Sequence, residues 1–451
     1  MTRSPTNPRP VTTGRYRYSK LRWRILVHAL DAVGSVAMRV WRAFRPVAVV
    51  TDPRRILIVQ LDHLGDSVLT SPLLDHLKRA YPRAAIDVLA STSNHEVFEA
   101  DPAVNQVWVA EQTWFERHPG RWGMLRAVWR LGRLVRREDY DLGIDVRGDV
   151  LTVLVLALGG IPRRVGWAMG GGGFLLTDIA QWVRGRHEVR SRLALLQPLG
   201  IVDVGPARVL VHVNDRDRAI VASWLAEAWP RKVARRLELP VGAGWLRDSF
   251  DRGEARRLSA AARTPPDDPD ALFAGRFGRY PPLLAVHIGA GTAAKRWPER
   301  NWNTLIKRFL EDGWRVVVVG GPDDPPAGAI LPRHERLQDW TGRLSVAQSA
   351  ALLERADLFI GADSGPAHLA ASAGTLSVIL FSGTNQPRQW RPWSRYSLIL
   401  RNRVPCQPCH QKVCPLADHP CMTGLGPDRV YRAARRFWAR VHHAESPHNP
   451  I

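Results

Sequence analysis

The sequence predicts an α/β protein with two parallel sheets. Three observations lead to this prediction. Short apolar strands alternate with helices after Pro46, a second series of the same kind begins at Leu283, and an irregular stretch at 226–282 separates the two. With 451 residues and 45% apolar content, the chain is long enough to bury the cores of two domains.

The segment before the first series, residues 1–50, is basic. Residues 1–19 are polar and Pro-rich and lack the apolar core of a signal peptide, which fits a disordered cytoplasmic start. From Lys20 to Phe44 the polar residues recur at steps of three and four and so share one helical face. These residues are Arg24, His28, Asp31, Ser35, Arg39 and Arg42. The apolar run is too short to span a bilayer, so the segment is either a basic amphipathic helix in the membrane interface or a helix packed on the body of the protein.

The first expected domain covers residues 51–225. Its strands are RILIVQL at 55–61, AIDVLA at 85–90, NQVWVA at 105–110 and LGIDV at 142–146. Its helices include 67–80, the basic 121–137 and one that begins near His187. The apolar stretch VLVHV follows at 209–213.

Residues 226–282 are rich in Arg, Pro and Asp and predict a linker with an insertion. The second domain, 283–440, follows, and a tail occupies 441–451. Its strands run into turns in the segments LLAVHIGAG, RVVVVGGPDD, ADLFIGADSGPAHLAASAG and SVILFSGTN. Because ligands bind beyond the carboxyl ends of parallel strands, these turns are expected to line one cleft.

The formal net charge of +22, from 64 Lys and Arg against 42 acidic residues, implies an anionic partner. Nucleic acid, an anionic membrane and a phosphorylated substrate all qualify, and solvated faces account for part of the excess. No nucleic-acid motif accompanies the charge, so no nucleic acid is expected as a partner. A dehydrogenase is disfavoured as well, because neither half has a G-x-G-x-x-G turn with an acid at the end of the next strand.

The turn after the first strand, in ILIVQLDHLGDSVLTSPLL, carries Asp62, His63, Gly65 and Asp66. Such a turn often binds phosphate through glycines and backbone amides, but two carboxylates repel phosphate. A carboxylate here suits a hydroxyl that must lose its proton during a reaction. The alternative is that Asp66 caps the following helix.

The segment DSGPAH predicts an anion site at a helix start. Asp363 or Ser364 is the expected cap, and Pro366 lies near the first turn. The free amides of Ser364 and Gly365 can hold a diphosphate against the positive end of the helix dipole, and His368 adds a donor one turn later. A plain capped helix is the alternative.

The turn GAGTAAKRWP places a cation after another strand. Lys295 is a point charge suited to a leaving diphosphate, and Thr292 supplies a hydroxyl nearby. Arg296 follows, so a solvated basic pair is the alternative. Asp323 and Asp324, after VVVVGG, are placed either to bind ribose hydroxyls or to form a turn.

All four cysteines lie in the segment CQPCHQKVCPLADHPC, as Cys406, Cys409, Cys414 and Cys421. Their C-x2-C-x4-C-x6-C spacing predicts a structural metal site, with Zn²⁺ as the first expectation and iron as the second. His410 and His419 are alternative ligands. Reduced thiols or a pair of disulfides are the other interpretations. No cofactor is expected for catalysis.

Seven segments in order resemble glycosyltransferase family 9, the heptosyltransferases of lipopolysaccharide assembly, which have a two-domain GT-B fold. The segments are LDHLGDSVLTSPLL at 61–74, YDLGIDVRGD at 140–149, RRVGW at 163–167, HEV at 187–189, HIGAGTAAKRWP at 287–298, GADSGPAHLAA at 361–371 and LFSGT at 380–384. The resemblance covers residues 54–440. The chain departs from the family at LFSGT, where a glycine-proline pair is more usual.

The resemblance implies an inverting, metal-independent transfer of a sugar from a nucleoside diphosphate sugar, expected to be ADP-heptose. The implied acceptor is a lipid-linked or phosphorylated glycan such as a lipopolysaccharide core. The family's proposed base falls on Asp66, with Asp62 and His63 as rivals. Lys295 is then placed at the leaving diphosphate, and Asp363 at sugar or ribose hydroxyls.

A cytoplasmic protein, peripheral at the inner face of the cell membrane, is the expected location. The competing hypothesis is a catalytically silent membrane- or nucleic-acid-associated binding protein on the same scaffold. Such a scaffold need not keep Asp66, Lys295 and His368 together, so their joint presence favours an enzyme.

Overall fold

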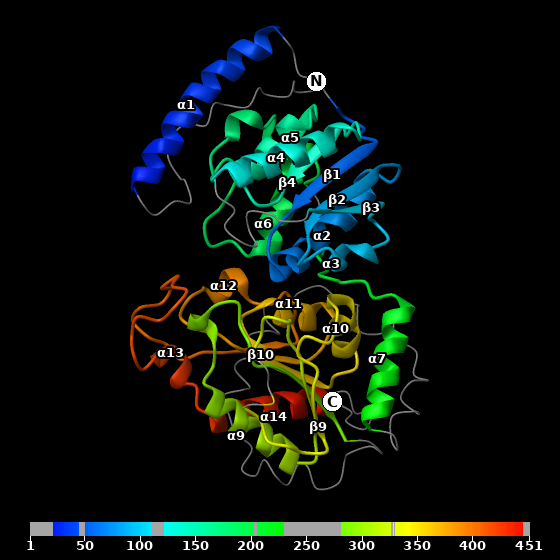
Figure 1. Ribbon diagram of the computed structural model, residues 1–451, viewed down its shortest axis with the longest axis vertical. Coiled ribbons are helices and arrows are strands. Elements are labelled where there is room, and N and C mark those ends of the chain that lie inside the picture. The colour runs from blue at the N-terminus through cyan, green and yellow to red at the C-terminus, as the bar shows by residue number, and fades with distance from the viewer. Residues whose placement is uncertain are drawn as a thin grey trace. The chain divides into compact units, whose positions relative to one another are not determined.

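The computed structural model describes most of the chain between its two ends. The described residues are 21–44, 50–110, 121–202, 205–229, 281–325, 328 and 330–444. They form two compact units, of which the first ends at Arg208 and the second begins at Val209 (Figure 1). Most of the expected linker, from 230 to 280, lies outside the described residues, as do residues 1–20 and most of the expected tail.

The first unit contains a parallel six-stranded sheet in the order β3-β2-β1-β4-β5-β6. Its strands are β1 (Arg55–Gln60), β2 (Ala85–Ser91), β3 (Gln106–Ala110), β4 (Leu142–Asp145), β5 (Arg163–Gly166) and β6 (Asp178–Ile179). The central strand β1 buries four apolar side chains in a row, Ile56 to Val59, which is the pattern of a strand covered on both faces. The four strands expected from the sequence are all present.

Helices cover this sheet (Figure 1). The helices of this unit are α2 (Leu64–Ala80), α3 (Glu96–Glu99), α4 (Arg121–Arg136), α5 (Val150–Leu158) and α6 (Glu188–Ala194), with 3₁₀ turns η1 (Gly173–Leu175) and η2 (Gln197–Leu199). A further helix, α1 (Leu21–Phe44), contacts η1. Side chains fix the starts of two helices: Asp149 accepts a hydrogen bond from the Leu151 amide at α5, and His187 accepts one from the Val189 amide at α6. The helix expected near His187 therefore begins there.

Helix α1 contacts the first unit through its polar face. The Asp31 side chain is buried, and its Oδ1 accepts a hydrogen bond from the Gly172 amide at 2.7 Å. Near the end of the helix, Arg42 Nη2 donates to the Leu176 carbonyl at 2.7 Å. The large apolar side chains of α1 that are exposed are Ile25, Leu26, Leu30, Val33, Val36, Val40, Trp41 and Phe44. The helix thus packs on the protein and still turns an apolar face outward.

The second unit repeats the architecture with the strand order β12-β11-β10-β7-β8-β9, again all parallel. Its strands are β7 (Leu283–His287), β8 (Arg315–Val318), β9 (Leu337–Asp339), β10 (Leu358–Ala362), β11 (Ser377–Leu380) and β12 (Ser397–Leu400). Strands β7, β8, β10 and β11 were expected from the sequence. The edge strands β9 and β12 were not.

The helices of the second unit include α7 (Asp215–Ala228), α9 (Glu299–Glu311), α10 (Val346–Leu353), α11 (Gly365–Ser372), α12 (Pro387–Trp390), α13 (Pro420–Thr423) and α14 (Pro427–Ala444), with the 3₁₀ turn η4 (Ala293–Lys295). Helix α9 lies beside α14 (Figure 1). It buries Trp302, Leu305, Ile306, Phe309 and Leu310 at helical spacing. Each such side chain contributes about 1.5–3 kcal/mol when fully buried.

The contacts of α7 place it in the second unit, although the sequence analysis put residues up to 225 in the first domain. Helix α7 packs on α10, and Arg218 donates two hydrogen bonds, of 2.9 and 3.0 Å, to the carboxylate of Glu354. The stretch VLVHV at 209–213 forms no strand and has no regular secondary structure; it leads into α7.

Candidate active site

Each sheet brings two distant loops together at its carboxyl edge. In the first sheet β1 lies between β2 and β4, and in the second β7 lies between β8 and β10, so the chain leaves the central strand in opposite directions. Loops that follow such neighbouring strands flank a crevice where ligands bind in α/β sheets. The loops after β1 and β4, and those after β7 and β10, therefore define one candidate site in each unit.

In the first unit, Asp66 lies in the first turn of α2 and is not the residue that caps it. The N-cap position is His63, whose side chain makes no capping hydrogen bond. Asp66 Oδ1 instead accepts a hydrogen bond from Arg192 Nη2 at 3.1 Å, and Arg192 Nη1 donates to Glu188 Oε2 at 2.9 Å. The buried Arg192 guanidinium is therefore hydrogen-bonded to two carboxylates, those of Asp66 and Glu188.

The rival Asp62 is buried and paired with Arg147, and His63 is exposed. Beside this pair, Asp145 at the end of β4 accepts hydrogen bonds from the Gly148 amide at 2.8 Å and the Arg147 amide at 3.2 Å. Burial raises the pKa of Asp145 to about 7. Of the acidic groups in the turn after β1, Asp66 is the more accessible, since its side chain is 18% exposed against 5% for Asp62.

In the second unit, the structure brings Lys295 to Asp363. Lys295 Nζ lies 3.1 Å from Asp363 Oδ2 and donates to the Asp363 carbonyl at 2.9 Å. Asn385 Nδ2 adds a hydrogen bond of 2.9 Å to the same carboxylate. Asp363 is buried, so these partners offset the cost of desolvating its charge. The carboxylate next to the expected anion site is thus neutralised by a cation.

Helix α11 begins as expected from DSGPAH. Ser364 occupies the N-cap position and Pro366 the first turn, and the Ser364 side chain makes no capping hydrogen bond. The first amides of an α-helix have no carbonyl partner within the helix, so those of Ser364 and Gly365 suit an anionic ligand. His368 is buried one turn later. In the loop after β7, Thr292 Oγ1 is buried and has no hydrogen-bond partner among the residues that the structure describes.

The two aspartates after β8 differ. Asp323 is exposed. Asp324 turns inward, accepts a hydrogen bond from the Gly321 amide at 2.8 Å, and lies 3.0 Å from His287 Nε2. Burial raises the pKa of Asp324, but the His287 and Gly321 hydrogen bonds and the nearby charges outweigh burial, so the net pKa is lowered. The turn-forming interpretation therefore suits Asp324, and Asp323 keeps its expected ribose role as a prediction.

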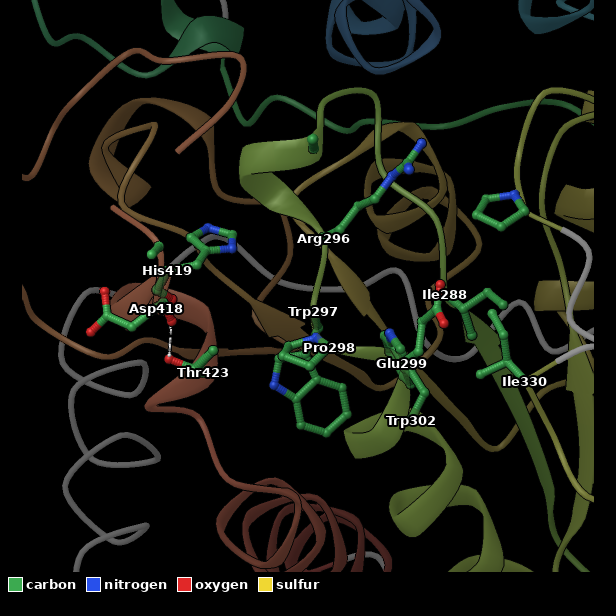
Figure 2. A pocket seen from close by; sticks show the side chains of 13 residues that line it. Ile288, Arg296, Trp297, Pro298, Glu299, Trp302, Ile330, Asp418, His419 and Thr423 are labelled. Atoms are coloured by element: carbon green, nitrogen blue, oxygen red, sulfur yellow. Dashed lines mark hydrogen bonds between the residues drawn. The ribbon is translucent and has the colours of Figure 1, made fainter. Parts of the chain in front are cut away.

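A pocket of about 300 Å³ adjoins the loop after β7 (Figure 2). Trp297 and Trp302 lie at its centre, with Asp418, His419 and Thr423 on one side and Ile288 and Ile330 on the other, as Figure 2 shows. Arg296 contributes a cation to its lining, whereas Lys295 and Ser364 do not line it. The candidate anion site is therefore defined by side chains and amides next to this pocket.

The four cysteines and His419 line a second pocket, of about 140 Å³. Burial raises the pKa of the Cys421 thiol, and the other three cysteines act electrostatically on it. The four cysteines form no disulfide with one another. Among the described residues, no three His, Cys, Asp or Glu side chains are arranged as a ready metal site. His419 Nε2 lies 3.0 Å from the Ala294 carbonyl, and His410 is exposed.

The sequence analysis missed the partners of the site residues. They are Arg147, Glu188, Arg192, His287 and Asn385. One signal was available, because Glu188 and Arg192 stand four residues apart and can pair on one helix face. For the others the local sequence holds no such sign.

Comparisons with known proteins agree with this arrangement. A family model described as glycosyltransferase family 9 (heptosyltransferase) matches residues 248–419. Lipopolysaccharide heptosyltransferase 3 of Escherichia coli strain K12 is 24% identical over 347 residues, which cover 73% of this chain and 83% of that protein. Lipopolysaccharide heptosyltransferase 1 of Pseudomonas aeruginosa is 28% identical over 395 residues, covering 83% and 96%. The solved structure of the E. coli ADP-heptose lipopolysaccharide heptosyltransferase II matches with a TM-score of 0.59 and 20% identity, covering 86% of this chain and 99% of that one.

The likeness extends along both units and includes their paired parallel sheets, which makes the chain a glycosyltransferase with a GT-B fold. Within that class it is similar to glycosyltransferase family 9, whose model matches residues 248–419 and whose members include the heptosyltransferases compared above. The competing hypothesis of a catalytically silent binding protein is not supported, because these relatives are named as transferases.

Proposed function

We propose that this enzyme moves heptose from ADP-heptose to a lipopolysaccharide-type acceptor, with inversion at the anomeric carbon. The observation that carries the proposal is the meeting of Lys295 with the open start of α11 at the carboxyl edge of the second sheet. A cation and unpaired amides at one place are what a leaving diphosphate requires. The names of the relatives support heptose and lipopolysaccharide, and ADP-heptose appears in the name of the E. coli structure.

In the proposed donor site, the diphosphate accepts hydrogen bonds from the amides of Ser364 and Gly365, and Lys295 balances its charge. His368 donates from one turn further along. The buried Thr292 hydroxyl, which has no partner among the described residues, gains one from the donor. Asp363 binds a sugar or ribose hydroxyl while Lys295 keeps its charge compensated, and Asp323 binds the ribose from its exposed turn.

In the proposed acceptor site, Asp66 takes the proton of the attacking hydroxyl. Arg192 holds one of its carboxylate oxygens, Oδ1, and so leaves Oδ2 to face the hydroxyl. Glu188 accepts a hydrogen bond from the same arginine and offsets part of its charge. The proposed reaction needs only side chains and amides of this chain and no cofactor.

The donor is tested by thermal unfolding in the presence of nucleotides. A ligand present at a hundred times its dissociation constant stabilises the folded state by about 2.7 kcal/mol. We expect ADP and ADP-sugars to raise the melting temperature, and UDP- and GDP-sugars at equal concentration to have no comparable effect. Stabilisation by UDP- or GDP-sugars in place of ADP-sugars would show that the donor carries a different base.

We further propose that α1 binds the anionic inner face of the cell membrane. The polar face of α1 is occupied by contacts with the first unit, and its outward face is apolar, with Val33 71% and Phe44 81% exposed. None of the described helices is long and apolar enough to cross a bilayer. An exposed apolar face of this kind on a basic protein suits the boundary between headgroups and acyl chains.

Helix α4 supports the same proposal. Its exposed face carries Trp122 and Trp129 together with Arg126, Arg130 and Arg133, and the helix contains no acidic residue. The Arg133 guanidinium lies 4.7 Å from the centre of the Trp129 ring. Tryptophan favours the membrane interface, and each arginine near an anionic surface contributes about 1 kcal/mol. Helix α4 packs on α5, α5 contacts η1, and η1 contacts α1, so α4 and α1 are linked through these elements within the first unit.

Flotation with vesicles tests the membrane proposal. The double variant Val33→Ser/Phe44→Ser removes two large apolar side chains from the outward face, and we expect its affinity for phosphatidylglycerol vesicles to fall by about tenfold or more. The matched control is Val202→Ser/Val413→Ser, which removes exposed apolar side chains elsewhere, and should bind as the wild type does. Equal binding by the α1 variant would refute a role for this face.

Finally, we propose that the four cysteines bind one structural Zn²⁺ or iron ion. Four sulfur donors line one small pocket, which is the donor set that these metals prefer. Binding requires the thiols to close around the ion, because their present arrangement is not a ready site. Elemental analysis of freshly purified, reduced protein is expected to give about one metal ion per chain, and Cys409→Ser/Cys414→Ser much less. If the purified protein contains no metal and has normal stability, the four cysteines are reduced thiols and the proposed metal site is wrong.

A further inference from the structure

Three side chains from three loops form a continuous hydrogen-bonded chain at the carboxyl edge of the second sheet. His287 lies at the end of β7, Asp324 follows β8, and Ser364 follows β10. His287 Nε2 lies 3.0 Å from Asp324 Oδ2, and Ser364 Oγ lies 3.2 Å from His287 Nδ1. The imidazole is buried. The chain therefore runs from an acid in the β8 loop to the first turn of α11, where the proposed diphosphate site lies.

The partners of His287 determine which of its nitrogens carries hydrogen. Asp324 is ionised at neutral pH, since its net pKa is lowered, and a carboxylate can only accept a hydrogen bond. Nε2 therefore carries a hydrogen and donates it to Asp324. In a neutral imidazole Nδ1 then has none, so the contact between Ser364 and His287 is a hydrogen bond only when the Ser364 hydroxyl donates to Nδ1. Ser364 Oγ is left with only lone pairs to offer, and these repel the oxygens of a phosphate.

Protonation of His287 reverses this polarity. Nδ1–H then donates to Ser364 Oγ, and the hydroxyl hydrogen is released from the imidazole. It can point to the Ala362 carbonyl, which lies 3.3 Å from Ser364 Oγ, or to an anionic oxygen that enters the site. One proton moves from solvent to Nδ1, and no covalent bond to the ligand forms or breaks.

We propose that binding of the nucleoside diphosphate is coupled to uptake of one proton by His287, which turns Ser364 from an acceptor into a donor toward the diphosphate. This inference rests on the proposed function, because it takes the start of α11 as the diphosphate site. His287 is a positioning residue in this scheme, since it acts on the ligand through Ser364. The same positive charge favours the diphosphate as it leaves the sugar and gains negative charge.

The other charged groups at this edge are Arg296, Lys295, Asp363 and Asp323, and the buried His368 on α11 is a second histidine of the site. Arg296 lies close enough to act electrostatically on Asp324. Lys295 is paired with Asp363, and Asp323 is exposed. Histidine is the side chain whose charge ordinarily changes between about pH 5 and 8, so variants at His287 and Ser364 are needed to separate His287 from His368. Coupling to proton uptake by His287 requires that the affinity for the diphosphate falls as the pH rises.

Calorimetric titration of ADP into the full-length enzyme between pH 6 and 8 tests the coupling. The terminal phosphate of ADP also titrates in this range, so the result is a comparison with variants that bind the same ligand. His287→Asn places an amide near the position of Nδ1, where it donates to Ser364 at every pH. We expect the wild-type dissociation constant to rise about tenfold more over this range than that of His287→Asn. At pH 7.5, buffers of different ionisation enthalpy should report proton uptake by the wild type and less by the variant.

Ser364→Ala keeps His287 but removes the group through which it acts, so it should bind ADP more weakly and also lose the additional pH dependence. The coupling is contradicted if the wild type and both variants bind ADP with the same pH dependence and the same proton uptake. That outcome overturns the coupling and leaves the donor site standing. If the wild-type enzyme binds no ADP at any pH, the proposal of an ADP-sugar donor is wrong, and the proposed coupling is wrong as well.

Discussion

Asp66→Asn is expected to lower turnover by about 10² or more, because an amide cannot accept the proton of the attacking hydroxyl. Folding should survive the change. Asp66 is not the N-cap of α2, and Arg192 keeps its second carboxylate partner, Glu188, when the charge at 66 is removed. The measurement is the steady-state rate with ADP-heptose and a lipopolysaccharide-core acceptor, together with the affinity for ADP, which should stay close to that of the wild type.

Asp75→Asn is the matched control for this substitution. Asp75 lies on the same helix and is also paired with an arginine, Arg79, but its side chain is 53% exposed. Its loss should change neither turnover nor ADP affinity, since exposed ion pairs contribute little. If Asp66→Asn turns over as fast as Asp75→Asn, the base lies elsewhere, and Asp62 is the next residue to replace.

Lys295→Met is expected to lower turnover by about 10²–10³ and to weaken ADP binding, since the cation stabilises charge that develops on the leaving diphosphate. The effect has a second cause in this structure. Without Lys295 the buried carboxylate of Asp363 keeps only Asn385 of its two side-chain partners, and its uncompensated charge repels the phosphates. Steady-state kinetics and ADP calorimetry measure the two effects separately.

Lys307→Met provides the comparison for Lys295→Met. Lys307 is an exposed lysine on α9, within the same unit, and its removal changes the net charge by the same amount. It should leave both measurements unchanged. Equal kinetics and equal ADP affinity in the two methionine variants would rule out Lys295 as the leaving-group cation.

The sequence predicted the elements whose signal is local. Strands such as β1 and β7 are uninterrupted apolar runs, because helices bury both of their faces. The edge strands β9 and β12 have half-exposed residues and therefore lack such a run. The stretch at 209–213 has the apolar residues but no neighbouring strand to pair with, and pairing is a tertiary property.

The same distinction applies to the candidate site. Asp66, Lys295 and Ser364 each follow a strand, which marks their turns as candidates, and the resemblance to the family then selected Asp66 and Lys295. Their partners Arg192 and Asp363 were fixed by strand order, which brings loops together from more than sixty residues away. That Asp66 is held by an arginine, and that Ser364 bonds to His287 instead of capping its helix, follows only from the folded arrangement.

The orientation of α1 has a consequence for work with the purified enzyme. Its inner face is joined to the first unit by hydrogen bonds of Asp31 and Arg42, and its outer face presents large apolar side chains to water. Contiguous apolar surface of this kind promotes association between molecules when no lipid is present. Detergent or lipid therefore belongs in any measurement of the enzyme's size in solution, because in plain buffer the outer faces of two α1 helices can cover each other and pass for a native dimer.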